Sequence, residues 1–244
     1  MTHSYYRRLI KGISPVSDQR KEEIEDMLER LNPDNPLSLI IDYMRVRIPS
    51  SEAVTFSVIC ERILRIPVEA FQHEGRGLYG YDGAYVCGNI MILTSQKEEL
   101  GFLLEMRGMG CRQFELHLMA YEETWFEFWE RCLLYDAVFK RVDLAVNDHF
   151  GILDIGHLID RCKNGECISK SRKFSDCGSG ELKYEKPDMG RTLYIGTRQS
   201  EIYFCIYEKD YEQWEKEGIP IDEAFTKNRF EIRLAYDRAS ETIR

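Results

Sequence analysis

The sequence lacks the features that mark membrane-spanning and secreted proteins. Its longer uncharged apolar runs, residues 37–41 and 84–93, fall well short of the roughly 20 residues that a membrane-spanning helix needs. The N-terminus, MTHSYYRRLIKGIS, has no apolar segment after its basic residues and so does not resemble an export signal. We therefore expect a cytoplasmic protein that does not contact a membrane.

Several catalytic and metal-binding motifs are also absent. The chain has no Walker loop, GxGxxG, HExxH, nucleophile elbow or CxxC pair. Its eight cysteines are scattered and mostly lie within apolar patterns, which indicates reduced thiols rather than a disulfide framework. The exception is Cys162, Cys167 and Cys177, with His157 just upstream, which could ligate zinc. The spacings are loose, so a zinc site is the weaker interpretation.

An excess of basic charge is missing as well. The 33 Lys and Arg residues face 42 Asp and Glu, a net charge of −9, which argues against a general nucleic-acid coat protein. Residues 161–200 reverse this balance, with nine basic and five acidic side chains. The sequence therefore predicts a local basic surface on an acidic body.

The pattern of apolar residues predicts an N-terminal helical extension followed by an α+β domain. Residues 1–35 contain an amphipathic helix behind Ser17. Residues 36–244 follow as one catalytic domain. In its first half we expect a strand at 37–47, a helix capped by Ser51, a hairpin turning at Asp82-Gly83, a strand at FLLEM and a helical stretch from about 111 to 136.

The second half repeats this order. A strand at 140–148 precedes a helix at 155–162, a polar loop at 163–179 and three strand-like segments, TLYIG, EIYFCIYEK and RFEIRLAYD. The repetition suggests two halves, about 36–138 and 139–244, that form two facing curved antiparallel sheets with helices. Two unrelated α+β lobes are the alternative.

Four acidic residues lie inside otherwise apolar strands. A charge in such a position is costly unless it is paired or binds a metal. Oxygen ligands from several strands suit a divalent cation such as Mg²⁺ or Mn²⁺, with a substrate phosphate completing the shell. A solvent-facing position or an ordinary salt bridge is the alternative for any one of them. The four are Asp42, Glu105, Asp143 and Glu231.

Two further segments carry candidate chemistry. In EIYFCIYEK the period of two places Tyr203, Cys205 and Tyr207 on one face, with Tyr207 at the polar end beside Lys209. A nucleophilic role for this phenol would need a base, a metal or nearby cations. The segment at 190–200, GRTLYIGTRQS, offers arginines and hydroxyls of the kind that contact phosphates.

Together, FLLEMRGMGCRQFE, KRVDLAVND, GRTLYIGTRQSEIYFCIYEK and NRFEIRL, in that order, resemble the replication initiation factor family. The family comprises trans-acting initiators of rolling-circle plasmids and related relaxases of integrative conjugative elements. The resemblance implies a saddle like that of the TATA-binding protein. It also implies that a tyrosine cleaves one DNA strand at an origin, becomes linked to the 5′ phosphate and leaves a free 3′ hydroxyl.

The resemblance also assigns roles to residues. It implies that Tyr207 is the nucleophile and is aided by Lys209. It implies a Mg²⁺ or Mn²⁺ ion held by Glu105, Asp143 and Glu231, with Asp42 as a fourth ligand. It further implies that DNA phosphates are contacted by Arg141, Arg191, Arg198 and Arg233. The implied partners are an origin hairpin or single strand, a host helicase and a second copy of the chain. Two other functions stay open: a DNA-binding and bending module without catalysis, and a zinc-containing interaction protein.

Overall fold

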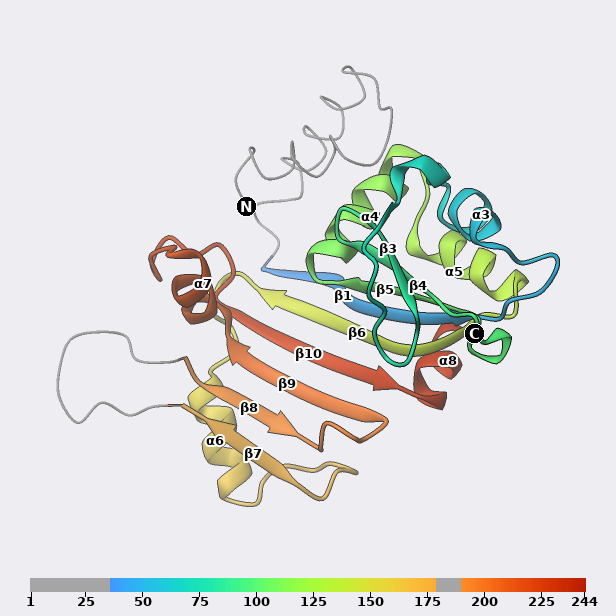
Figure 1. Cartoon of the computed structure of the whole chain (residues 1–244). Helices are drawn as coiled ribbons and strands as arrows, with labels where there is room; N and C mark the ends of the chain where they lie inside the picture. The colour runs from blue at the N-terminus through green and yellow to red at the C-terminus, as the bar shows by residue number, and fades with distance from the viewer. Residues whose placement is uncertain (1–35, 179–189) are drawn as a thin grey trace. The chain divides into compact units, whose positions relative to one another are not determined.

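The computed structural model describes residues 36–178 and 190–244, so the predicted extension at 1–35 lies outside the described residues. The described chain divides into two compact units (Figure 1). The first consists of Ile41–Val142 and Ala239–Arg244, and the second of residues 36–40 and Asp143–Arg238.

The first unit is built on antiparallel strands with one apolar face. β1 pairs with β5, and the ladder continues through β4 and β3 to β2. Met44, Val46 and Ile48 of β1 are fully buried, because every second residue of the strand enters the core. The strands are β1 (Leu37–Ile48), β2 (Gln72–His73), β3 (Gly83–Cys87), β4 (Ile90–Thr94) and β5 (Phe102–Arg107).

Helices cover the apolar face of these strands. α4 packs on β4 and β5, and α5 packs on the π-helix η1. The rings of Phe114 and Phe128, 4.7 Å apart, join α4 to α5. The helical segments are α3 (Phe56–Val58), η1 (Ile59–Leu64), η2 (Val68–Ala70), η3 (Glu98–Leu100), α4 (Met109–Ala120), α5 (Trp125–Leu134) and α8 (Asp237–Ile243). Within the described ranges, none of the helices reaches the length and apolarity needed to cross a bilayer.

Three local predictions for the first unit are wrong. The hairpin turns at Gly88, whose φ is +62°, and not at Asp82-Gly83, because the Asp82 carboxylate accepts hydrogen bonds from Ser95 and Gln96 after β4. Thr55, not Ser51, caps the first helix. The single long helix is two helices, because a capping box at Thr124 starts a new one.

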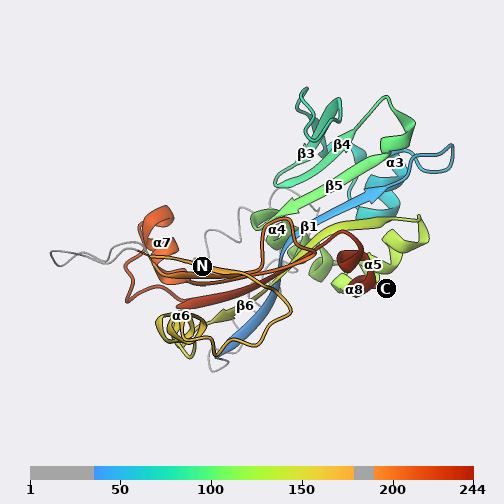
Figure 2. The same ribbon diagram turned by 90° about the horizontal axis from the view of Figure 1, so that it is seen from below.

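The second unit is a second antiparallel ladder with a helix on one face. β10 pairs with β9, β9 with β8, and β8 with β7. Ile155 and Ile159 of α6 pack against Leu193 and Ile206 of the strands. Figure 2 views these strands edge-on, with α6 on one side of them. The elements are β6 (Val138–Asp148), α6 (Ile155–Lys163), β7 (Phe174–Cys177), β8 (Thr192–Ile195), β9 (Ile202–Glu208), α7 (Lys209–Glu217) and β10 (Asn228–Ala235).

The α+β class predicted from the sequence is confirmed, with one difference. The strands follow one another in a single order, β2-β3-β4-β5-β1-β6-β10-β9-β8-β7, where two facing sheets were expected. β1 and β6 each contribute residues to both units, so the strand order continues from one to the other. The polar loop predicted at 163–179 contains the short strand β7.

A buried carboxylate ties the end of β6 to the start of β10. Asp148 is completely buried and accepts hydrogen bonds from the backbone N–H of Phe150 (3.1 Å) and Leu153 (2.8 Å) and from the Asn228 side chain (3.0 Å). Burial alone would raise the pKa of Asp148, but these donors together lower it below the ordinary value. Asp148 thus fixes where β10 begins, and with it the side chains that β10 carries.

We predict that Asp148→Asn lowers the free energy of unfolding by about 2 kcal/mol at pH 7, because it removes charge-assisted hydrogen bonds. Since the folded pKa lies below the unfolded value of about 3.9, the wild-type advantage is present above pH ~4 and is lost as the pH falls through the folded pKa. Urea unfolding at pH 7 and pH 3 measures this difference. The control Asp222→Asn, an exposed position, should change stability little at either pH. An Asp148→Asn deficit that persists undiminished at low pH would contradict the prediction.

Candidate functional site

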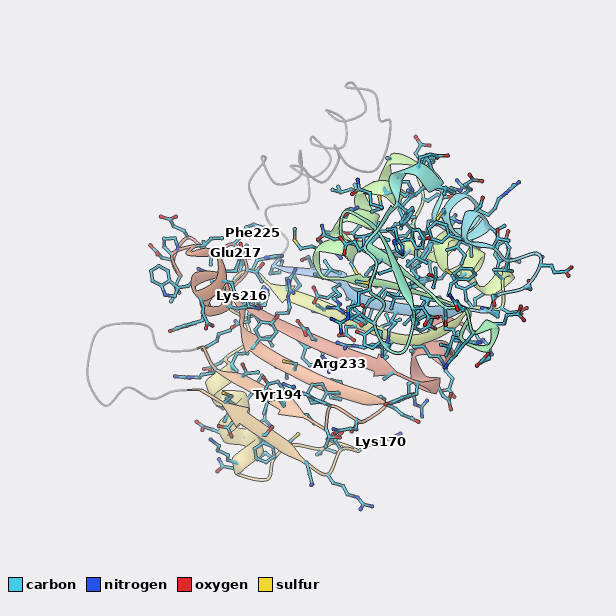
Figure 3. The ribbon with its side chains drawn as sticks, viewed as in Figure 1. Lys170, Tyr194, Lys216, Glu217, Phe225 and Arg233 are labelled. Atoms are coloured by element: carbon cyan, nitrogen blue, oxygen red, sulfur yellow. The ribbon has the colours of Figure 1, made fainter. Side chains whose placement is uncertain are left out.

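The face of the second unit opposite α6 carries polar side chains from neighbouring strands. Tyr203, Cys205 and Tyr207 alternate along β9 with the residues that face α6. In the register of β9 with β10, Tyr207 lies opposite Arg229, Cys205 opposite Glu231 and Tyr203 opposite Arg233. Tyr194 of β8 lies opposite Cys205; Figure 3 labels it together with Arg233. We call these residues, with Asp143 and Asn147 of β6, the Tyr207 face.

Tyr207 is held by a carboxylate at the centre of this face. Its hydroxyl donates a hydrogen bond of 2.8 Å to Oε1 of Glu231. Nη1 of Arg229 lies 3.8 Å from the same Glu231 oxygen, and Nε of Arg229 donates to the Asn147 side chain at 2.7 Å. The phenol, the carboxylate and the guanidinium therefore form a connected set in which Asn147 orients the arginine.

The surroundings hold the phenol of Tyr207 in its neutral form. Burial is the largest effect and raises the pKa of Tyr207 far above the ordinary value of about 10. The positive charge of Arg229 opposes this rise, whereas the negative charges of Glu231 and Glu212 add to it. Ionisation of this hydroxyl consequently requires a proton acceptor or an additional cation.

Lys209 stands beside the ring because α7 begins directly after β9. Its ammonium nitrogen lies 5.7 Å from the centre of the Tyr207 ring and pairs with Glu212 one turn along the helix. Glu212 also pairs with Lys216. Burial by itself would raise the pKa of Glu212, but its two lysine partners lower it to about 2. A lysine–carboxylate pair is thus part of the environment of Tyr207.

Two of the predicted phosphate-binding arginines lie further along the same face. Arg233 lies 5.2 Å over the Tyr203 ring, and its Nε is 3.5 Å from an oxygen of Asp143. Burial raises the pKa of Tyr203 and Arg198 opposes that rise, so the guanidinium of Arg198 lies near the same residue. Tyr203 stacks on Tyr194, with ring centres 5.8 Å apart. The face therefore combines arginines with aromatic rings.

Arg191 and Arg141 have other neighbours. A Cβ on Gly156 of α6 would lie only 2.0 Å from Nη1 of Arg191, so this side chain packs on the α6 side of the strands and not on the Tyr207 face. Arg141 belongs to the first unit, where its guanidinium lies 3.9 Å over the ring of Tyr43. The structure thus places Arg198 and Arg233 near Tyr203, Arg191 beside Gly156 and Arg141 over Tyr43.

Two of the predicted metal ligands, Asp42 and Glu105, belong to the first unit. Ile41 and Met44 of β1 are both buried, so the alternation of the strand is interrupted at Asp42 and Tyr43 between them. The hydroxyl of Tyr43 donates a hydrogen bond to Glu105.

Glu105 is itself fully engaged in hydrogen bonds. It is 1% exposed, and its Oε1 accepts from the hydroxyls of Tyr43 and Tyr79, the latter at 3.0 Å. Its Oε2 accepts from Arg107 at 2.8 Å. Burial alone would raise the pKa of Glu105, but the donors and the charge of Arg107 together lower it. Glu105 is an ionised carboxylate surrounded by donors.

Asp143 and Glu231 are the predicted ligands that do lie on the Tyr207 face. Among the described residues no group of three or more His, Cys, Asp or Glu side chains is placed to hold a metal. The predicted zinc ligands Cys162, Cys167 and Cys177 therefore do not form such a group. Cys162 is buried in the apolar cluster between α6 and the strands, whereas Cys167 and Cys177 are exposed. One or two carboxylates, with phosphate oxygens and water, are however the usual protein contribution to a Mg²⁺ site. Asp143 and Glu231 fit that contribution and are the residues that would hold the cation.

Sequence reasoning gave no role to three residues that contact this site. Arg229 lies two residues before Glu231, and Asn147 lies four residues after Asp143, so strand alternation alone would have put both on the face. Glu212 lies three residues after Lys209, a spacing at which helical side chains meet. The spacing of these residues along the strands and the helix could have identified them, once it was known which face of each strand carries Tyr207.

The fold and the face together define a class: α+β chains in which antiparallel strands of one unit present a tyrosine held by a carboxylate among arginines. Comparisons with known proteins place this chain more narrowly. A family described as "Replication initiation factor" matches residues 137–244. A second, "Rolling Circle replication initiation protein N-terminal domain", matches residues 38–131. The chain is thus similar to the replication initiation factor family over residues 137–244 and to the N-terminal domain of rolling-circle initiators over residues 38–131.

Individual proteins agree with this assignment. The chain is 37% identical over 211 residues, 86% of its length, to a Bacillus subtilis (strain 168) protein described as "Putative DNA relaxase NicK". It spans 59% of the length of that relative. A solved structure of a rolling circle replication initiator protein from Geobacillus stearothermophilus superposes with a TM-score of 0.71 and 26% identity, covering 85% of this chain and 77% of the other.

The carboxylate next to Tyr207 makes a titration experiment informative. We predict that Tyr207 stays protonated well above pH 10 and that Glu231→Gln lowers its pKa, because a neighbouring negative charge is removed. NMR of ring-labelled tyrosine, with the Tyr207 signal assigned by its loss in Tyr207→Phe, follows the ionisation. Glu217→Gln, which removes an exposed carboxylate at the end of α7, is the control and should leave the midpoint unchanged. A midpoint near 10 in the wild type would refute the burial described above.

Proposed function

We propose that the chain is a DNA nickase or relaxase that cleaves one strand by transesterification at Tyr207. The observation that carries the proposal is the 2.8 Å hydrogen bond from the Tyr207 hydroxyl to Glu231, a nucleophile and a proton acceptor within direct reach. The names of the similar proteins, a DNA relaxase and a rolling-circle initiator, support the same reaction class.

In the proposed reaction the Tyr207 oxygen attacks the scissile phosphorus while its proton passes to Glu231. The bond from phosphorus to the 3′ oxygen breaks, and that oxygen takes a proton from water and leaves as the free 3′ hydroxyl, while Glu231 returns the tyrosine proton to solvent. The 5′ phosphate stays linked to the tyrosine. Because one phosphoester bond replaces another, the step needs no nucleotide cofactor, and attack by a 3′ hydroxyl in the reverse direction reseals the strand.

The charges around Tyr207 suit this step. Arg229 favours the developing phenolate and lies next to the base, and Lys209 supplies a second cation over the ring. Arg198 and Arg233, both near Tyr203, would bind phosphates of the strand to one side of the scissile bond. When bound by Asp143 and Glu231, Mg²⁺ or Mn²⁺ would polarise a non-bridging phosphate oxygen. A host helicase and a second copy of the chain stay predicted partners.

One observation favours a second candidate, a DNA-binding module that does not cleave. Burial and two carboxylates oppose ionisation of the Tyr207 phenol. A protein that only holds a DNA hairpin or single strand would need the arginines and aromatic rings of the face but not this hydroxyl.

Replacement of one hydroxyl separates the two candidates. We predict that Tyr207→Phe abolishes both nicking of supercoiled origin DNA and the covalent adduct with a single-stranded oligonucleotide, while its stability changes by less than about 1 kcal/mol. Gel assays for nicks and for the adduct measure both. Tyr194→Phe and Tyr203→Phe are the controls from the same face and should keep both activities. Adduct formation by Tyr207→Phe, or its loss in either control, would assign the nucleophile to another tyrosine; a wild type that binds DNA but never nicks it would favour the binding module.

The metal requirement gives an independent prediction. We expect EDTA to abolish nicking and Mg²⁺ or Mn²⁺ to restore it, and we expect Asp143→Ala to lose the metal-dependent rate while binding of an uncleaved oligonucleotide persists. Asp222→Ala, which removes an exposed carboxylate of the same unit, is the control. Equal cleavage with and without EDTA would show that the acids of the Tyr207 face act without a cation.

A further inference from the structure

A second group of arginines and tyrosines lies in the first unit. Its centre is the buried Glu105, and the side chains around it come from β1, β5, β6 and the loop before β3. We call it the Glu105 cluster; it consists of Glu105, Tyr43, Arg45, Tyr79, Arg107 and Arg141.

The cluster contains more arginine side chains than carboxylates. Arg107 pairs with Glu105 at 2.8 Å, Arg45 lies 4.9 Å over the Tyr79 ring and Arg141 lies 3.9 Å over the Tyr43 ring. Three guanidinium groups thus gather around one ionised carboxylate in a chain whose net charge is −9. Guanidinium groups stacked on aromatic rings are a common arrangement in nucleic-acid recognition.

Tyr79 is held in place and yet is open to solvent. Its hydroxyl donates to Glu105 at 3.0 Å and accepts from Arg107 at 3.1 Å, while 54% of the residue is exposed. Its φ of +55° is rare for an aromatic residue. The neighbouring Tyr81 anchors the loop, because it packs on the apolar group that contains Leu93 and donates to the carbonyl of Leu100.

A purely structural role does not account for this exposure. A hydrogen-bonded network that only stabilised the fold would gain from covering its members, but the Arg107 side chain is 56% exposed and Tyr79 nearly as much. A fixed, solvent-facing aromatic ring beside exposed guanidinium groups is what a stacked base and its phosphate require.

We propose that the Glu105 cluster is a second contact site for single-stranded DNA, in which a base stacks on Tyr79 and a phosphate pairs with Arg107. Glu105 is the positioning residue that holds the side chains of Tyr79 and Arg107. The proposal rests on the proposed function in one respect, that the substrate of this chain is single-stranded DNA. It assigns the first unit a share of substrate binding that does not depend on Tyr207.

Binding is measured in the Tyr207→Phe background so that cleavage does not interfere. Fluorescence anisotropy with a labelled 15-nucleotide dT strand gives the affinity, and a strand of equal length without bases isolates stacking. We expect Tyr79→Ala to weaken dT binding by about 5- to 150-fold, the change that about 1–3 kcal/mol of stacking corresponds to. Tyr79→Phe, which keeps the ring, should stay within about 3-fold of the parent. With the abasic strand, Tyr79→Ala and its parent should bind alike.

Tyr236→Ala is the matched control. Tyr236 is 60% exposed and has a φ of +54°, nearly the same exposure and backbone conformation as Tyr79, and it lies outside the cluster. Its replacement should leave dT affinity unchanged.

A second experiment tests the phosphate contact. Arg107→Gln should reduce the slope of log K against log[salt] by about 0.7, whereas Arg62→Gln, at an exposed position on η1, should leave the slope unchanged.

Each outcome decides between the alternatives. Unchanged dT affinity in a folded Tyr79→Ala, or an equal loss for the dT and abasic strands, would overturn the proposal and leave the role of Tyr207 intact. A parent that binds neither strand would overturn the proposed function as well. Circular dichroism and the midpoint of thermal unfolding establish that each variant is folded. If Tyr79→Ala does not fold, Tyr79→Leu replaces it in the experiment. A dT affinity of Tyr79→Leu equal to that of Tyr79→Phe would then overturn the stacking role.

Discussion

Alternation of side chains along β9 and β10 is the constraint on which the candidate site depends. Because Ile206 must pack on α6, its neighbours Cys205 and Tyr207 are directed to the opposite face. The register then sets Glu231 next to Cys205 and within hydrogen-bonding reach of Tyr207. Asp148, by fixing the start of β10, holds that register. The hydrophobic contact on one side of the strands thus determines the chemistry on the other.

Strands and their faces could be predicted from the sequence, whereas partners distant in the chain could not. The period of two in EIYFCIYEK gave the face of Tyr207, and the apolar pattern gave β1, β6 and β10 close to their observed bounds. The sequence marks Glu105 as an acid inside an apolar strand, but its hydrogen bonds come from Tyr43, 62 residues away, and from Tyr79 in the loop before β3. No local pattern encodes those contacts.

Errors in turns and caps have a common cause. Asp82-Gly83 has the composition of a tight hairpin turn, but its carboxylate caps the segment after β4, and the chain turns at Gly88 instead. Arg191 has the composition of a phosphate ligand, but it lies one residue out of phase with Tyr194 and packs beside Gly156. In both cases the residue type indicated what the side chain could do chemically, but the packing around it decided where the side chain points.

The junctions between the two units have a consequence for how such chains can diverge. Besides the junction in α8 between Arg238 and Ala239, the chain passes from one unit to the other within two strands, in β1 between Ile40 and Ile41 and in β6 between Val142 and Asp143. An insertion or deletion of one residue at either point would turn every later side chain of that strand to the other face. Recombination between relatives is better tolerated in the short connection between α5 and β6, near the place where the two family matches meet. Exchange of halves among these proteins should therefore carry β6 whole, with the second unit.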